Sequence, residues 1–129
     1  MAYDEVSVEI DKSASNAWEI VGDFGGLKRF APGVEECILD GDVRNLTIMG
    51  NKVAEKLVSN DSSNMELKYT IIEGFPLTSH ESTMKVESLS PTSCKVTWSV
   101  NAEPDDMASF LSTIYKAGLD ALKQTLERS

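Results

Sequence analysis

The chain has 129 residues, and its formal net charge is −9. Because nucleic-acid backbones and anionic membranes attract cations, this charge argues against both as partners. The first residues lack the basic and apolar regions of a signal peptide, and no segment has the length of a membrane span. We therefore expect a soluble cytoplasmic protein without membrane insertion. Its length fits one domain over residues 1–129, and the sequence does not indicate an oligomeric state.

The cysteine and histidine pattern gives little support to a metal site. Cys37 and Cys94 are far apart, neither belongs to a CxxC pair, and His80 is the only histidine. A structural zinc ion usually needs four such ligands, so we expect no metal and two free, partly buried thiols. Gly25-Gly26 lacks the Lys and Ser/Thr of a phosphate-binding loop. We accordingly expect no cofactor.

The N-terminal region predicts a strand followed by two short helical segments. Residues 3–10 alternate apolar and polar side chains with the period of a half-buried strand. Asn16 followed by Glu19 fits a capping box, which predicts a helix that ends at Gly25-Gly26. A second helical turn is expected over residues 27–30 before Pro32-Gly33 breaks the chain.

The middle of the chain, residues 34–103, predicts six more strands, because strand-like runs alternate there with turn signals. Residues 105–127 then predict one long amphipathic helix. Gly118 lies inside this helix and weakens it by about 1 kcal/mol relative to Ala, which indicates close packing or a gap left for something else. The turn signals lie at Asp40-Gly41, Gly50-Asn51, Asn60–Asn64, Gly74–Pro76 and Ser90-Pro91, and the apolar stripe of the helix comprises Met107, Phe110, Leu111, Ile114, Leu119, Leu122 and Leu126.

Together these elements predict an α+β unit, in which a seven-stranded antiparallel sheet packs on a long C-terminal helix. Several local motifs support a more specific comparison. They are Trp18, Asp23-Phe24-Gly25-Gly26-Leu27, Phe30 with Pro32 and Val34, Gly41 with Arg44, Glu55-Lys56-Leu57, Tyr69-Thr70-Ile71, Phe75-Pro76-Leu77 and Trp98.

The order and spacing of these motifs resemble the START/Bet v 1-like (SRPBCC) superfamily over nearly the whole chain. The most similar branch is that of the polyketide cyclases/dehydrases, which also contains lachrymatory-factor-synthase-like proteins. The resemblance implies a helix-grip fold, in which a curved sheet wraps the C-terminal helix around a cavity for a small apolar molecule.

Hairpin pairing predicts where the charged side chains lie. A two-residue loop at Gly50-Asn51 would place Arg44 diagonally across from Glu55, within reach of long side chains. Later loops would place Glu55 opposite Tyr69, and Tyr69 opposite Ser82. Arg44 and Glu55 then share an inward, mostly apolar face. The same pairing sets Ile71 opposite His80 and Met84 opposite Trp98, and it directs outward Lys52, Lys56, Glu66, Lys68, Glu81, Lys85, Glu87 and Lys95.

Two interpretations of Arg44 and Glu55 remain open. An inward ion pair is costly unless its geometry is good, and it could simply tie two strands together near an open rim. In the functional interpretation, Arg44 holds a ligand oxygen and Glu55 moves a proton, oriented by Tyr69. The resemblance favours the second, because related enzymes are similar in using an Arg and a Glu at matching strand positions.

The inward face and the long helix also supply candidate ligand contacts, although aromatic residues and Met at these positions are by default plain core. These candidates are Leu57, Leu67, His80, Ser82, Met84, Trp98, Phe110, Ile114 and Gly118.

Two functions fit these expectations. One is an enzyme that binds a small apolar, oxygen-bearing substrate and catalyses its cofactor-independent cyclisation, dehydration or rearrangement. The alternative is a carrier or sensor of a hydrophobic ligand that uses the same cavity without turnover.

Overall fold

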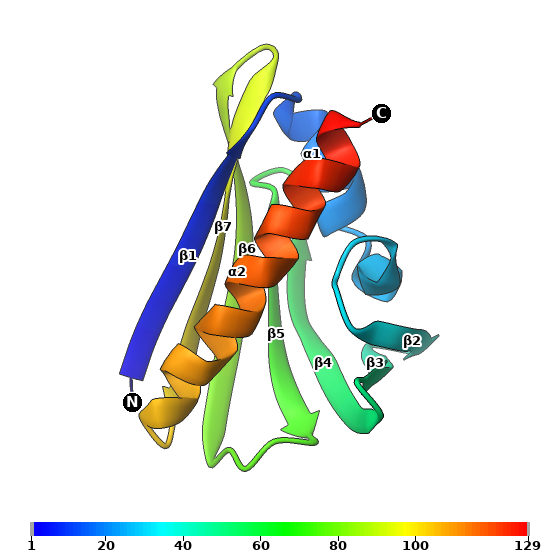
Figure 1. Ribbon diagram of the computed structural model, residues 1–129, viewed down its shortest axis with the longest axis vertical. Coiled ribbons are helices and arrows are strands. Elements are labelled where there is room, and N and C mark those ends of the chain that lie inside the picture. The colour runs from blue at the N-terminus through cyan, green and yellow to red at the C-terminus, as the bar shows by residue number, and fades with distance from the viewer. Residues whose placement is uncertain (1, 129) are drawn as a thin grey trace.

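The structure, a computed structural model, describes residues 2–128 and contains one seven-stranded antiparallel sheet that curves around a long C-terminal helix (Figure 1). The strand order is β1-β7-β6-β5-β4-β3-β2, which confirms the predicted α+β architecture. The elements are β1 (Ala2–Ile10), α1 (Ala14–Val21), the 3₁₀ helix η1 (Phe24–Arg29), β2 (Val34–Asp40), β3 (Val43–Ile48), β4 (Asn51–Asp61), β5 (Glu66–Glu73), β6 (Ser79–Ser90), β7 (Ser93–Glu103) and α2 (Asp106–Glu127).

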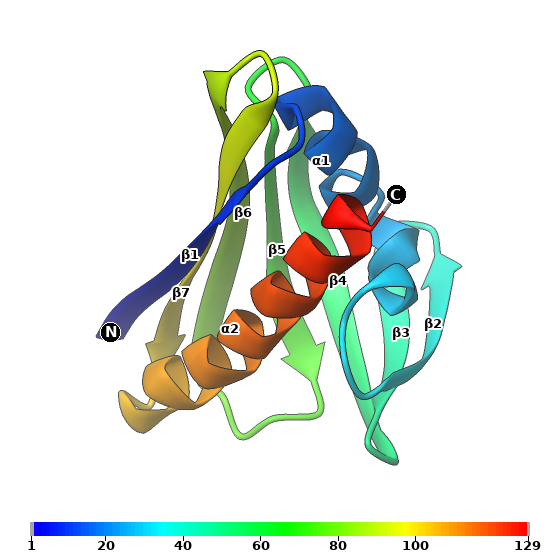
Figure 2. The ribbon, with the colours of Figure 1, turned by 45° about the horizontal axis from the view of Figure 1, so that its top comes forward.

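Helix α2 crosses the concave side of the sheet, as the rotated view shows (Figure 2). It is uninterrupted from Asp106 to Glu127, as predicted, and it packs against β1 and β7. The helix packs there because its apolar stripe faces the sheet, and Leu111, Leu119 and Leu122 of that stripe are fully buried. No helix within residues 2–128 is both long and apolar enough to cross a membrane.

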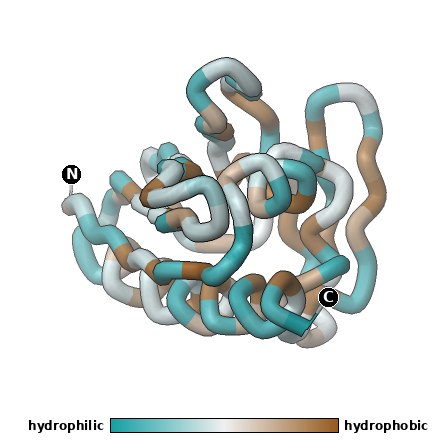
Figure 3. The backbone as a smooth tube through the Cα atoms, turned by 90° about the horizontal axis from the view of Figure 1, so that it is seen from above, coloured by the Kyte–Doolittle hydropathy of each residue, from teal (hydrophilic) through white to brown (hydrophobic). Residues whose placement is uncertain are grey.

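The other half of the core consists of apolar side chains that alternate with polar ones along the strands. Hydrophobic and hydrophilic residues follow one another along the strands (Figure 3), and in β7 every second residue is buried. Within the described residues, Arg44 and Glu55 are the only charged side chains among the buried ones, as the pairing predicted. Cys37 and Cys94 are free thiols; Cys37 is half-buried and Cys94 is fully buried.

The predicted boundaries of the two N-terminal helical segments are wrong. Helix α1 begins at Ala14, and the cap is Ser13, whose Oγ accepts a hydrogen bond from the Asn16 N–H at 3.2 Å. The earlier start is favoured because it includes Ala14 on the buried face of the helix. The helix ends at Val21, with Gly22 as its C-cap, rather than at Gly25-Gly26, and both of those glycines lie inside η1.

The predicted loop of the β3–β4 hairpin is displaced by one residue. Met49 and Gly50, with φ of 49° and 82°, form the two-residue turn, rather than Gly50-Asn51. Left-handed φ at both positions is what this type of turn requires, but a methionine gives no signal for it. Contacts with a distant segment hold the turn: the Met49 N–H donates to the Gly33 carbonyl at 3.0 Å, and the Gly50 N–H donates to Glu35 Oε1 at 2.6 Å.

This shift in register changes the central pair of charges. Arg44 stands directly opposite Glu55, not diagonal to it. The two side chains therefore share one face of the hairpin at the shortest cross-strand separation.

The pairing of β4 with β5 also differs from the prediction. Glu55 faces Ile71, and Tyr69 faces Leu57 instead of Glu55. The connecting loop lies at residues 62–65, and two bulges place an extra residue at Ile72 and at Val58. Both are apolar yet about half exposed, so their composition does not reveal the bulges. The predicted pairs Tyr69–Ser82 and Met84–Trp98 are confirmed.

Candidate functional site: a cavity beneath the long helix

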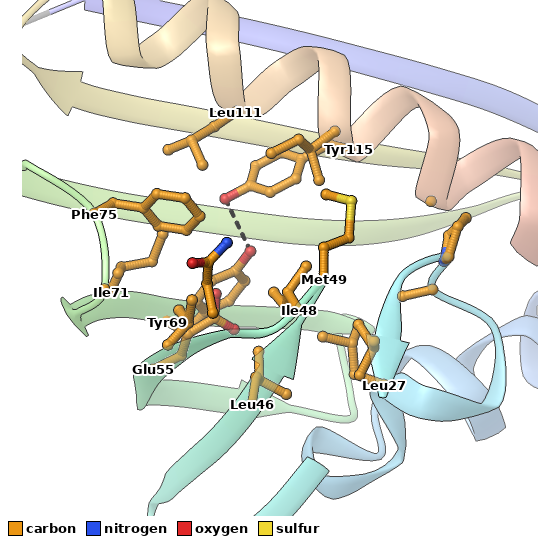
Figure 4. A pocket seen from close by; sticks show the side chains of 18 of the residues that line it. Leu27, Leu46, Ile48, Met49, Glu55, Tyr69, Ile71, Phe75, Leu111 and Tyr115 are labelled. Carbon is orange, nitrogen blue, oxygen red and sulfur yellow. Dashed lines mark hydrogen bonds between the residues drawn. The ribbon is translucent and has the colours of Figure 1, made fainter. Parts of the chain in front are cut away.

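A cavity of about 290 Å³ lies between α2, the concave face of the sheet and the segment that follows η1 (Figure 4). This volume is at the lower end of the range of roughly 300–1,000 Å³ that ligand pockets occupy. Most of the wall is aliphatic or aromatic. Its residues are Leu27, Ala31, Pro32, Val34, Leu46, Ile48, Met49, Asn51, Val53, Glu55, Tyr69, Ile71, Gly74, Phe75, Trp98, Phe110, Leu111, Ile114, Tyr115 and Gly118.

Six residues singled out from the sequence line this cavity, and six do not. Those in the wall are Glu55, Tyr69, Trp98, Phe110, Ile114 and Gly118. Leu67 and Met84 are instead cross-strand partners in the packed core. Leu57 is half-buried against the same core. The residues outside the wall are Arg44, Leu57, Leu67, His80, Ser82 and Met84.

Sequence reasoning missed the part of the wall contributed by residues 27–34 and by β3. The segment 27–34 is irregular, and a period-based argument cannot place irregular backbone over a cavity. Leu46 and Ile48 point inward by parity, so this signal was available in β3. Tyr115 is the most important omission, because it brings a buried hydroxyl to the wall.

Close packing of Trp98 on α2 closes one side of the cavity. A Cβ atom at Gly118 would lie 2.9 Å from Trp98 Cζ3, so only glycine leaves room for the indole. The Trp98 ring is stacked on that of Tyr115, with centroids 4.1 Å apart and an angle of 3° between planes. Both explanations considered for this mid-helix glycine apply, because Gly118 packs closely against Trp98 and also lines the cavity.

Arg44 and Glu55 form a buried ion pair beside the cavity. Arg44 Nε donates to Glu55 Oε1 at 2.7 Å, and Nη2 lies 2.6 Å from the same oxygen, off the direction of a full hydrogen bond. Nη1 donates to the Phe24 carbonyl at 3.1 Å. Neither contact with Glu55 uses its second oxygen, Oε2, and Glu55 itself lines the cavity.

The Arg44 guanidinium is also enclosed by aromatic rings. Its central carbon lies 4.2 Å from the centroid of Phe24 and 4.7 Å from that of Tyr69. Burial by itself lowers the pKa of Arg44, but the charge and hydrogen bond of Glu55, together with Tyr69 and Cys37, outweigh this effect and the pKa is raised overall. Arg44 therefore remains a cation and does not give up its proton. It also lies outside the wall of the cavity.

A second polar cluster, which we call the hydroxyl network, consists of Tyr69, His80, Ser82 and Tyr115. The two phenol groups point toward each other with oxygens 3.0 Å apart (Figure 4). Ser82 Oγ lies 2.7 Å from the Tyr115 oxygen and 2.8 Å from His80 Nε2. Two donors enter from outside: Trp98 Nε1 donates to the Tyr69 oxygen at 3.1 Å, and the Ile71 N–H donates to His80 Nδ1 at 3.0 Å.

Burial keeps the hydroxyl network uncharged at neutral pH. Loss of solvation lowers the pKa of His80 to about 4 and raises the pKa values of Tyr69 and Tyr115 above that of a free tyrosine. Its members therefore act as hydrogen-bonding groups rather than as ions. No three His, Cys, Asp or Glu side chains in residues 2–128 form a group that could hold a metal ion.

Comparison with known proteins agrees with this architecture. Residues 1–127 match the family described as polyketide cyclase / dehydrase and lipid transport. The chain belongs to this family. This is the polyketide cyclase/dehydrase branch that the sequence motifs resemble, so the resemblance is confirmed. Among curated protein sequences, none matches the chain.

Solved structures with the same fold include the protein XoxI and two enzymes. The protein XoxI from Bacillus cereus is 28% identical, with a TM-score of 0.93 over 98% of this chain and 96% of that one. The ZhuI aromatase/cyclase from Streptomyces is 17% identical, with a TM-score of 0.81 over 98% and 93% of the two chains. Norcoclaurine synthase from Thalictrum flavum, solved with dopamine and hydroxybenzaldehyde, is 20% identical, with a TM-score of 0.76 over 98% and 86%. At these identities the two enzymes share the fold alone.

Proposed function

We propose that this protein binds a small, mostly apolar molecule that carries an oxygen atom, and that it acts as a carrier or sensor of that molecule. The observation that carries this proposal is the cavity of about 290 Å³, whose wall is aliphatic and aromatic except for a few polar groups gathered near Glu55, Tyr69 and Tyr115. Burying an apolar ligand there gains about 25 cal/mol per Å² of apolar surface. The family description, which includes lipid transport, supports the same class of function.

The polar groups favour binding over turnover. The charges of Arg44 and Glu55 balance one another, and the Arg44 guanidinium also donates to the Phe24 carbonyl. His80 is uncharged at neutral pH and lies behind the wall. A catalytic acid or base works best when its pKa is near the working pH, and the hydroxyl network contains no such group.

Uptake of a neutral fluorescent dye tests this proposal. N-Phenyl-1-naphthylamine should brighten and saturate at one molecule per chain. Ile114→Trp fills the cavity from α2 and should weaken dye binding at least tenfold. Ile72→Trp makes the same change at an exposed position outside the wall and serves as the control. Equal dye affinity in the two folded variants would contradict the proposed location.

A second candidate function is proton transfer by Glu55, and it has one specific observation in its favour. Glu55 lines the cavity, and its Oε2 takes no part in the contacts with Arg44. A carboxylate placed in this way could accept a proton from a bound substrate, with Tyr69 nearby in the wall. Arg44 would then hold the carboxylate in position.

Hydrogen exchange on a simple ketone tests this second candidate. If Glu55 acts as a base, the protein should accelerate exchange of deuterium from D₂O into the carbon next to the carbonyl of α-tetralone, as followed by NMR. Glu55→Gln should remove the acceleration while the ketone still binds. Glu73→Gln removes an exposed carboxylate from β5 and is the control. The absence of acceleration by the parent protein would leave the carrier or sensor function alone.

A further inference from the structure

The hydrogen atoms of the hydroxyl network can be counted, because two of its bonds have a fixed direction. A backbone N–H can only donate, so the bond from Ile71 makes His80 Nδ1 an acceptor. His80 is neutral at pH 7, and its ring hydrogen therefore resides on Nε2. The Trp98 indole N–H likewise can only donate, and the Tyr69 oxygen receives it.

Four hydrogens then remain for three contacts. They belong to His80 Nε2 and to the hydroxyls of Ser82, Tyr115 and Tyr69. The short contacts among these groups are His80–Ser82 at 2.8 Å, Ser82–Tyr115 at 2.7 Å and Tyr69–Tyr115 at 3.0 Å. A further approach of His80 Nε2 to the Tyr115 oxygen at 3.4 Å adds no acceptor, since that nitrogen already carries a hydrogen. One hydroxyl hydrogen thus has no acceptor within the network.

Burial decides which hydroxyl carries the spare hydrogen. Ser82 is 0% exposed and does not line the cavity, so an unused Ser82 hydroxyl hydrogen would be buried without a partner. Ser82 therefore donates to Tyr115, as Tyr69 does. The Tyr115 hydrogen is the one left over, and Tyr115 lines the cavity. Reversing the bond between the two phenols moves the spare hydrogen to Tyr69, which lines the same cavity.

We infer that the two tyrosines present one hydrogen-bond donor to the cavity, and that the ligand is a neutral carbonyl compound whose oxygen accepts this bond. This inference rests on the proposed binding function and assigns the oxygen anchor to the Tyr69–Tyr115 pair, with Ser82 as the group that directs it. A carbonyl fits because it accepts without needing to donate. An anionic ligand fits poorly, because the Glu55 carboxylate is part of the same wall.

A matched pair of probes tests the inference on the whole chain. α-Tetralone and tetralin share a ring skeleton, but only tetralone has a carbonyl oxygen. The protein should bind tetralone about tenfold more tightly, as expected for one neutral hydrogen bond. The carbonyl stretch of bound tetralone should shift to lower wavenumber than in hexane. The double variant Tyr69→Phe/Tyr115→Phe should remove both effects, because either hydroxyl alone could still donate to the cavity. Tyr3→Phe, at an exposed tyrosine on β1, should retain them.

Ser82→Ala provides a test that does not depend on the stability of the double tyrosine variant. If Ser82 donates to Tyr115, this variant keeps the shifted carbonyl stretch of the parent. If Tyr115 donates to Ser82, the shift is absent in the parent and appears only in Ser82→Ala, and the inference is overturned. A long-range ¹H–¹⁵N NMR spectrum should also find the His80 hydrogen on Nε2, and a hydrogen on Nδ1 would overturn the count.

The remaining outcomes separate this inference from the proposed function. Equal affinity for tetralone and tetralin, with an unshifted carbonyl stretch, overturns the donor assignment and leaves the binding function standing. If neither probe nor N-phenyl-1-naphthylamine binds, the binding function fails, and the inference fails with it.

Discussion

Two buried polar clusters lie within one core, and their polar groups are paired in different ways. The ion pair joins Arg44 on β3 to Glu55 on β4, with Phe24 and Tyr69 against the guanidinium. The hydroxyl network joins β5, β6 and α2 through uncharged groups. The first cluster neutralises itself, whereas the second has one more donor than acceptors within it.

The difference follows from the free energy of burial. An unpaired buried charge costs several kcal/mol, so an ion pair in a core has to be complete without a ligand. An unused neutral hydrogen-bond group costs only about 1–3 kcal/mol, less where water reaches it. A protein can therefore reserve a neutral donor for a ligand more cheaply than it can reserve a charge.

Breaking the ion pair should give the largest effect. Arg44→Met leaves Glu55 buried without its partner and should lower the free energy of unfolding by about 3–5 kcal/mol. Urea denaturation followed by circular dichroism measures this change.

A matched variant and a double variant sharpen this first test. Arg29→Met removes an arginine whose side chain is 50% exposed and lies 3.7 Å from Asp23, and it should cost less than about 1 kcal/mol. Adding Glu55→Leu to Arg44→Met should restore much of the loss, because no buried charge remains. A small loss in Arg44→Met alone would mean that Glu55 is not held by this pair.

The hydroxyl network should make stability depend on pH between about 6.5 and 4. The unfolded chain protonates His80 below its ordinary pKa of 6.5, whereas the folded protein resists protonation until about pH 4. The unfolded state thus binds more protons in this window, and the free energy of unfolding falls as the pH falls. The loss should reach up to about 3 kcal/mol at pH 4.

The contribution of His80 is obtained by difference. His80→Asn keeps an acceptor near the Ile71 N–H but cannot titrate, so its stability should fall less steeply than that of the parent over this window. Hydrogen bonds and nearby charge lower the pKa values of Asp61 and Glu127, but both groups affect parent and variant alike and cancel in the difference. Parallel curves for parent and variant between pH 6.5 and 4 would show that His80 is not buried as a neutral group.

Gly118→Ala tests the close contact that holds Trp98 beside the hydroxyl network. In an unobstructed helix, Gly→Ala should stabilise by about 1 kcal/mol. At Gly118 the new Cβ lies 2.9 Å from Trp98 Cζ3, and overpacking typically costs about 1–3 kcal/mol. The net result should be a loss of about 1 kcal/mol by thermal denaturation, and a gain in stability would contradict the packing described.

The smallest effect on stability should come from the rim of the cavity. Phe110 is 49% exposed, lines the cavity and contacts Phe75 edge-on, with centroids 6.0 Å apart. Phe110→Ala should change stability by less than about 1 kcal/mol but weaken dye binding several-fold. Leu89→Ala, at a leucine that is 51% exposed and outside the wall, is the control. Similar dye affinities in both variants would show that Phe110 is not part of the binding surface.

Patterns in the amino-acid sequence predicted the large features of this fold. The three-and-four spacing of apolar residues predicted α2 correctly, and alternation predicted that Arg44 and Glu55 are the buried charges. The pairs Tyr69–Ser82 and Met84–Trp98 also followed from loop lengths. These features are local or periodic, so a pattern in the sequence is enough to specify them.

The direct pairing of Arg44 with Glu55 and the composition of the cavity wall depend on contacts between distant segments. The turn at Met49 is set by Gly33 and Glu35, and the bulges fall at apolar residues that give no turn signal. Helix α2 brings Tyr115 against Ser82 on β6, residues that are 33 positions apart in the chain. Such contacts depend on how distant segments pack, because the energy of a hydrogen bond or a close contact depends on atomic positions that the periodicity of one segment does not specify.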